Sequence, residues 1–114
     1  MKYMVMNYSN EENEADIPPS AEAIEAMSSF LGDAAKSGVL LAAEGVRASS
    51  YGARLSVDGG KVTVTDGPFA EAKEIIAGFA ILDVSSKEEA IEHAKRFATL
   101  AGATRVDVRL VAEF

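Results

Sequence analysis

The sequence predicts an α+β domain with the ferredoxin-like strand and helix order βαββαβ, into which a β-hairpin is inserted. Two segments, 20–35 and 86–101, carry apolar residues at helical spacing. Strand-like segments flank both helices, and a glycine-containing turn at 58–60 joins two alternating segments. A chain of 114 residues is long enough for one hydrophobic core and short for two, so we expect a single domain over 1–114.

The first third of the chain reads as a strand, a loop and a helix. Residues 2–8, KYMVMNY, are rich in Met, Val and Tyr and predict a strand. The acidic segment EENEAD at 11–16 lacks the D-x-D-x-D-G order of an EF-hand loop, and we interpret it as a solvated loop. Two prolines and Ser20 then precede a helix, which Gly38 can end. The apolar face of this helix consists of Ile24, Met27, Leu31, Ala34 and Ala35.

The middle of the chain has the patterns of β-structure. The apolar run VLLAAEGV at 39–46 is typical of a strand, although Glu44 interrupts it. Segments 53–57 and 61–65 alternate apolar and polar residues, and the Asp-Gly-Gly sequence at 58–60 supplies turn chemistry between them. Segments 53–57 and 61–65, with the turn at 58–60 between them, predict a hairpin.

The last third predicts a central strand, a helix and a closing strand. IIAGFAILDV at 75–84 has too many consecutive apolar residues for a half-exposed strand, so both of its faces should be covered. Ser86 and Glu89 have the spacing of a capping box that starts a helix, and Gly102 would end it. Apolar and charged residues then alternate over 106–110, as in a strand.

This order leaves one face of the sheet in need of a cover. Both helices would pack on the same face of an antiparallel sheet. The apolar character of 75–84 nevertheless indicates that the other face is covered as well. A second copy of the chain is the most economical cover, so we predict a homodimer with its sheets face to face.

Composition and charge exclude several classes of function. The net charge of −7 repels phosphate backbones and anionic lipid, so direct binding to nucleic acid is disfavoured. No apolar run approaches the roughly 20 residues of a membrane span, and no secretory signal begins the chain. The absence of cysteine fits the cytoplasm. Nucleotide-binding and zinc motifs are also absent, and a single histidine is too few for a histidine-rich metal site, so we predict no cofactor and no metal.

The stretch VTVTDGPFAEAKE at 62–74 carries the leading candidate site. Asp66 cannot form an ordinary Asx-turn, because the residue two positions on, Pro68, has no N–H. Its carboxylate could cap a short helix through the N–H of Phe69, leave the cap to Gly67, or face a cleft as a general acid or base. Asp66 is therefore a candidate catalytic residue, and Gly67, Pro68 and Phe69 are candidate ligand-binding residues.

Four further residues have two interpretations each. Glu44 is either exposed at a sheet edge or a second acid or base, because a buried carboxylate needs a partner or a proton. Arg47, Tyr51 and Arg54 are either solvated hairpin positions or ligands for an anionic substrate. His93, the one histidine, flanks the apolar face of the second helix, and we interpret it as a surface or boundary residue.

VTDGPFAEAKE, followed by IIAGFAILDV, the helix SSKEEAIEHAKRFA and the closing RVDVRLV, resembles the YCII-related family, in the branch named after its DGPF tetrapeptide. The resemblance runs in element order from about Lys2 to Val111. It implies a ferredoxin-like fold that dimerises into a dimeric α/β barrel, with the residues at 66–69 lining or shaping a cleft. The His-Asp pair proposed as catalytic in the wider family is not matched, because the lone His93 lies on the second helix.

The resemblance implies little about activity, because most members of this family have no known one. Similar dimeric barrels include small isomerases, dehalogenating enzymes and oxygenases that act on cyclic or aromatic compounds. We therefore expect a cleft for a small organic ligand, with acid–base chemistry through Asp66. The alternative is a non-enzymatic interaction or sensory module that works with a sigma factor or another transcription regulator. The sequence does not decide whether a reaction is catalysed.

Overall fold

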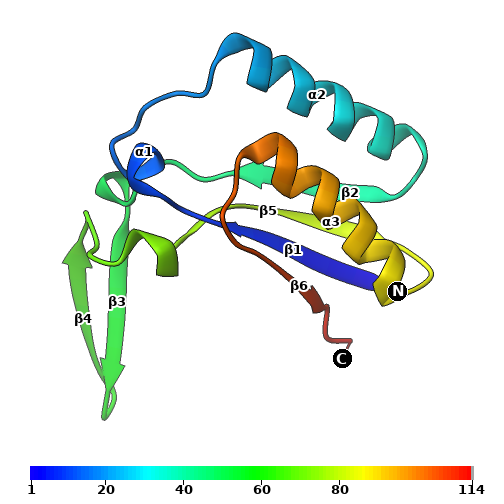
Figure 1. Cartoon of the computed structure of the whole chain (residues 1–114). Helices are drawn as coiled ribbons and strands as arrows, with labels where there is room; N and C mark the ends of the chain where they lie inside the picture. The colour runs from blue at the N-terminus through cyan, green and yellow to red at the C-terminus, as the bar shows by residue number, and fades with distance from the viewer. Residues whose placement is uncertain (114) are drawn as a thin grey trace.

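Four strands form one antiparallel sheet in the order β2-β5-β1-β6, as the predicted βαββαβ arrangement requires. They are β1 (Lys2–Tyr8), β2 (Leu40–Gly45), β5 (Ile76–Asp83) and β6 (Val106–Leu110). Two long helices, α2 (Ala21–Lys36) and α3 (Lys87–Ala101), lie on the same face of this sheet in the computed structural model, which describes residues 1–113 (Figure 1). The ferredoxin-like α+β fold is confirmed, and 75–84 supplies the predicted central strand.

Both long helices begin at the serines that the sequence indicates. Ser20 caps α2, and Ser86 caps α3 by accepting the N–H of Glu89 at 3.1 Å. The reciprocal half of the predicted capping box is wrong, because the Glu89 carboxylate accepts the hydroxyl and N–H of Ser85 instead, at 2.6 and 3.0 Å. The hydrogen bond from the Ser85 hydroxyl, and after it the one from the Ser85 N–H, hold the pKa of Glu89 below its usual value. Gly102 ends α3 at a φ of +63°, as predicted.

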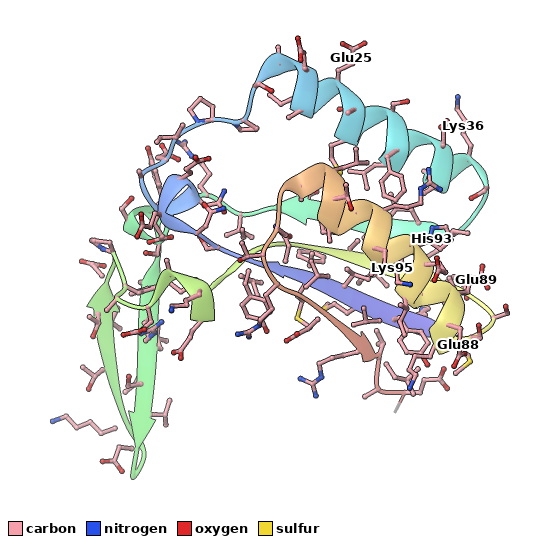
Figure 2. The ribbon with its side chains drawn as sticks, viewed as in Figure 1. Glu25, Lys36, Glu88, Glu89, His93 and Lys95 are labelled. Carbon is pink, nitrogen blue, oxygen red and sulfur yellow. The ribbon has the colours of Figure 1, made fainter. Side chains whose placement is uncertain are left out.

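The polar faces of both helices point outward. Figure 2 shows Glu25 and Lys36 on the outer surface of α2, directed away from the sheet. Three of the seven buried residues in the core between helices and sheet are alanines, and Val5, at 1% exposure, is the largest fully buried side chain within residues 1–113. The other buried residues of this core cluster are Tyr3, Ala80, Leu82, Val84, Ala90 and Ala94.

On the face of the sheet opposite the helices, the central strands β1 and β5 carry apolar residues, whereas the edge strands carry the charged residues Glu44, Asp107 and Arg109. Successive side chains of a strand point to opposite faces, and the buried Val5 and Leu82 face the helices. The alternate residues therefore point away from the helices, and each of them is half-buried: Met4 and Met6 on β1, and Phe79 and Ile81 on β5.

The predicted hairpin forms a separate two-stranded sheet of β3 (Ala53–Asp58) and β4 (Lys61–Asp66), which projects away from the main sheet (Figure 1). Gly59 and Gly60 have φ values of +54° and +83°, the left-handed conformations that a tight two-residue hairpin turn requires. Every residue of both strands is exposed.

The acidic segment at 11–16 is not simply a loop, so that prediction is wrong. It contains the short helix α1 (Glu11–Glu14), which Asn10 caps by accepting the N–H of Asn13 at 2.8 Å. Three acidic residues in its single turn suit the positive end of the helix dipole. A helix of four residues is too short to show apolar periodicity, and this explains the wrong prediction.

Candidate functional site

A cleft of about 630 Å³ opens between the N-terminal half of α2 and the sheet. The C-terminal half of α2 packs against the protein, where Ala34 is buried and Phe30 and Leu31 are half-buried. Ile24, earlier on the same predicted apolar face, is 51% exposed and lines the cleft together with Met27. The first turns of α2 thus direct apolar side chains into open space instead of a core.

The floor of the cleft has no bulky side chains where strands β2 and β5 pair. Gly45 and Gly78 lie opposite each other in register, next to Ala43. A Cβ atom at position 78 would lie 2.9 Å from Oδ1 of Asn7 and 3.0 Å from the carbonyl oxygen of Glu44. Only glycine therefore leaves both oxygen atoms in place.

Asn7 is the polar group of this floor. It pairs with Gly78 on β5 and faces the helices, as Val5 does two residues earlier. Its Oδ1 is buried, and within residues 1–113 it has no hydrogen-bond partner. A buried amide oxygen without a partner costs about 1–3 kcal/mol, so such a group calls for an explanation. The sequence gives no signal for Asn7, because a polar residue near the end of a strand looks like the start of a loop.

Apolar side chains form most of the walls of the cleft, and α1 and its N-cap supply most of the polar ones. The main apolar residues are Ile17, Pro18, Ile24, Met27, Leu31, Phe97 and Leu100, and the polar side chains of the walls are Asn10, Glu12, Asn13 and Ser28. No Lys, Arg or His within residues 1–113 lines the cleft. Glu12 supplies a carboxylate to the wall, whereas Glu44 pairs with Phe79 and therefore directs its side chain to the opposite face of the sheet.

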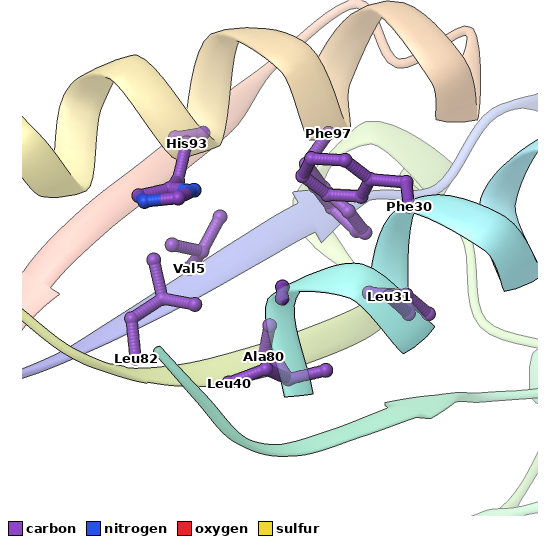
Figure 3. A pocket seen from close by; sticks show the side chains of 10 residues that line it. Val5, Phe30, Leu31, Leu40, Ala80, Leu82, His93 and Phe97 are labelled. Atoms are coloured by element: carbon purple, nitrogen blue, oxygen red, sulfur yellow. The ribbon is translucent and has the colours of Figure 1, made fainter. Parts of the chain in front are cut away.

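The cleft shares Leu31 and Phe97 with a small cavity between the two helices and the sheet (Figure 3). The cavity has a volume of about 10 Å³, which is room for no more than one water molecule. Figure 3 shows His93 on α3, directed from the helix toward Val5 and Leu82. His93 is half-buried, in agreement with a boundary residue.

The predicted site residues at 66–69 lie elsewhere, at the base of the hairpin. The N–H of Phe69 donates to Oγ of Ser49 at 2.8 Å, and the N–H of Gly67 donates to the carbonyl of Gly52 at 3.0 Å. A Cβ at position 67 would lie only 1.8 Å from the carbonyl oxygen of Ser49. The DGPF turn is thus pressed against backbone that only a glycine can approach so closely.

Ser49 connects this turn to α1. It belongs to the helical turn η1 (Ser49–Tyr51) and is 7% exposed. Its N–H donates to the carboxylate of Glu14 at 2.9 Å, and its hydroxyl donates to the other oxygen of the same carboxylate while accepting from Phe69. The DGPF turn, η1 and α1 therefore form one hydrogen-bonded unit, which we call the DGPF lock. The sequence contains no signal for this pairing, because 35 positions separate Ser49 from Glu14.

Both helix-cap interpretations of Asp66 are wrong. The next helical turn, η2 (Ala72–Glu74), starts only after Glu71, and Ser49 takes the N–H of Phe69. Asp66 is the last residue of β4 and is exposed, and within residues 1–113 its carboxylate has no hydrogen-bond or ion-pair partner. The carboxylate is free for a ligand, but Asp66 does not line the α2 cleft.

The remaining predicted residues are exposed around the lock. Nη2 of Arg47 donates to Asp16 at 2.6 Å and to the hydroxyl of Tyr51 at 2.8 Å, and that hydroxyl donates to Asp16 at 3.1 Å. The bond from Arg47, with that from Tyr51, holds the pKa of the Asp16 carboxyl below its usual value. Arg47 therefore already has a carboxylate partner. The guanidinium of Arg54 lies 4.1 Å from the centre of the Phe69 ring. Glu44 is exposed on the edge strand β2.

The fold and the cleft define a small ferredoxin-like α+β protein with a candidate ligand site beneath one helix. The model of the YCII-related domain family matches residues 1–114. The chain therefore belongs to the YCII-related family.

A solved structure with a similar fold is 5-chloro-2-hydroxyhydroquinone dehydrochlorinase (TftG) from Burkholderia phenoliruptrix AC1100, in complex with 2,5-dihydroxybenzoquinone. The two folds match with a TM-score of 0.56 and 13% identity, over 100% of this chain and 96% of that chain. An uncharacterized protein of Rhizobium meliloti (strain 1021) is 47% identical over 36 residues, which are 32% of this chain and 29% of that protein. This match thus covers less than a third of the relative's length.

Neither a membrane helix nor a ready-made metal site is found in the described part of the chain. No helix within residues 1–113 is long and apolar enough to cross a bilayer. In the same residues, no three His, Asp or Glu side chains converge as metal ligands would.

Proposed function

We propose that this protein is a cytoplasmic homodimer that binds a small organic molecule in the cleft beneath α2. The observation that carries the proposal is that Ile24 is 51% exposed and Met27 only half-buried on the side of α2 that faces the protein, where a helix normally buries its apolar residues. A volume of about 630 Å³ lies within the range of small-molecule sites. The small cyclic ligand of TftG supports the proposal by analogy of fold.

A ligand screen with a blocked cleft tests this proposal. We expect Met27→Trp to fill the cleft and to abolish binding of screen hits, detected by chemical shift changes of the Leu100 methyl groups. Glu25→Trp is the matched control, because Glu25 points away from the sheet (Figure 2). Hits that bind Met27→Trp as tightly as the unmodified protein would place the ligand elsewhere.

The dimer is supported by apolar surface that the protomer leaves open. One face of the hairpin carries four aliphatic side chains, each 53–71% exposed: Leu55, Val57, Val62 and Val64. A two-stranded hairpin alone is at best marginally stable in water, so this stripe needs a cover. The radius of gyration is 15.6 Å, against about 13 Å for a compact domain of this length. We propose that a second copy covers both the hairpin stripe and the open sheet face.

Two lysine variants of the hairpin test the dimer. Val57→Lys puts a charge on the apolar stripe, and we expect it to raise the dimer Kd at least tenfold in sedimentation experiments. Thr63→Lys puts the same charge on the polar face of the hairpin and should leave the Kd unchanged. If the unmodified protein is a monomer at micromolar concentration and a sigma factor retains it, the stripe belongs to the regulator module instead.

Acid–base chemistry through Asp66 is a separate proposal. The free, exposed carboxylate at the end of β4 supports this proposal. The position of Asp66 outside the lining of the α2 cleft argues against it. Glu44, exposed on an edge strand, is the weaker second candidate. Asp66→Asn preserves the shape and removes the base. Unchanged turnover or ligand affinity in this folded variant would contradict a catalytic role.

A further inference from the structure

Asn7 combines two properties that the rest of the cleft lacks. Its Oδ1 is buried without a partner within residues 1–113, and Gly78 keeps the space beside it free of any side chain. The side-chain amide can donate through its NH₂ group and accept through its oxygen, and half a turn about the Cβ–Cγ bond exchanges the two. The floor of the cleft therefore offers one adaptable polar group in a mainly apolar site.

The charges around the cleft are unfavourable for an anion. Among residues 1–113 no cationic side chain lines it, and the one charged side chain of its walls is the carboxylate of Glu12. A carboxylate or phosphate entering the cleft would lose its hydration without gaining a counter-charge. The chain's net charge of −7 adds to this repulsion.

We propose that the cleft selects an uncharged, largely apolar molecule that carries a hydroxyl or carbonyl group, and that Asn7 recognises this group by a hydrogen bond. The proposal rests on the ligand-binding function proposed above and adds to it the class of ligand and the recognition residue. A hydroxyl or carbonyl suits an amide that can both donate and accept. Recognition of this kind also accounts for a buried oxygen that the protein itself leaves unpaired.

Three probes of similar size and different polarity test the proposal: naphthalene, 2-naphthol and 2-naphthoate. Binding is measured by chemical shift changes of the methyl groups of Met27 and Leu100 in the cleft, with Val57 on the hairpin as an internal reference. We expect 2-naphthol to bind about threefold to tenfold more tightly than naphthalene, the usual net gain of one hydrogen bond. We expect 2-naphthoate to bind most weakly.

Asn7→Leu should remove the preference for 2-naphthol over naphthalene while leaving naphthalene binding. Because the amide oxygen has no partner to lose, this variant should fold with an unchanged or raised Tm. Asn7→Ala removes the amide without adding bulk and takes its place if Asn7→Leu does not fold. Ser29→Ala, at the exposed neighbouring position outside the cleft lining, is the control and should keep the preference.

The outcomes separate this inference from the function on which it rests. Loss of the preference in the Asn7 variants alone supports the inference. Binding in the cleft with the same preference in Asn7→Leu or Asn7→Ala, or tightest binding of 2-naphthoate, overturns the inference and leaves the ligand site standing. No shift of the cleft methyl groups with any probe overturns both proposals.

Discussion

Replacing Gly67 by alanine should break the DGPF lock. The new Cβ would lie 1.8 Å from the carbonyl oxygen of Ser49 and 2.6 Å from its carbonyl carbon, whereas real Cβ contacts are at least 3.0 Å. The backbone must therefore separate by at least 3.0 − 1.8 = 1.2 Å. Such a movement also disrupts the bond of 2.8 Å from the Phe69 N–H to Ser49.

The expected loss of stability follows from these two effects. Overpacking against rigid surroundings costs about 1–3 kcal/mol. Depriving a partly buried N–H of its acceptor costs about 1–3 kcal/mol more. Together they predict that Gly67→Ala lowers the free energy of unfolding by about 2–6 kcal/mol, which corresponds to a fall in Tm of roughly 8–24 °C for a domain of this size.

Gly32→Ala is the matched control, because it makes the same chemical change within α2. Nothing lies within 4 Å of the Cβ that it adds. Alanine is the better helix former by about 1 kcal/mol, so this variant should be slightly more stable than the unmodified protein. Thermal unfolding followed by circular dichroism, at one protein concentration, measures both variants. A Tm of Gly67→Ala within about 3 °C of the unmodified protein would refute this account of the turn.

Two further variants test the contacts around the lock. Ser49→Ala removes the hydroxyl that joins Phe69 to Glu14 and should lower the free energy of unfolding by about 1–3 kcal/mol in urea titrations, whereas Ser50→Ala, at the exposed neighbour, should not. Because the folded protein lowers the pKa of Asp16, the charged carboxylate stabilises the fold above its ordinary pKa of 3.8, and this contribution disappears as the pH falls through the lowered value. The difference in Tm between the unmodified protein and Asp16→Asn, measured by thermal unfolding, should therefore shrink from pH 7 to pH 3. A difference that stays constant would contradict a stabilising ion pair between Asp16 and Arg47.

The fold was largely predictable because its signals are local. The left-handed glycines at 59, 60 and 102 stand where turn chemistry and a helix end require them. The apolar runs and helical spacings each depend on neighbouring residues within one element, and the order of the elements then restricts the topology. The helix at 11–14 was missed because one turn is too short for a periodic pattern.

The site was less predictable because its contacts join distant parts of the chain. One of the three interpretations of Asp66 is a helix cap through the N–H of Phe69, but that N–H donates to Ser49, 20 positions earlier. Asn7 can be recognised as a candidate site residue only once Gly78 is seen beside it, and the pairing of β1 with β5 brings the two residues together. A single sequence shows neither proximity. The sequence likewise could not show that the N-terminal half of α2 lies over a cleft, because the apolar residues of a helix have the same spacing over a core and over a cleft.

The DGPF lock connects the tetrapeptide to the cleft wall, although residues 66–69 do not line the cleft. Glu14, at the end of α1, is held by Ser49, while Asn10 and Glu12 at the start of the same short helix form part of the cleft wall. The signature turn thus anchors a short segment of the wall, in which Asn10 is half-buried and Glu12 is exposed. For a ligand bound as proposed, a substitution that breaks the lock would weaken binding in the cleft, although residues 66–69 do not line it.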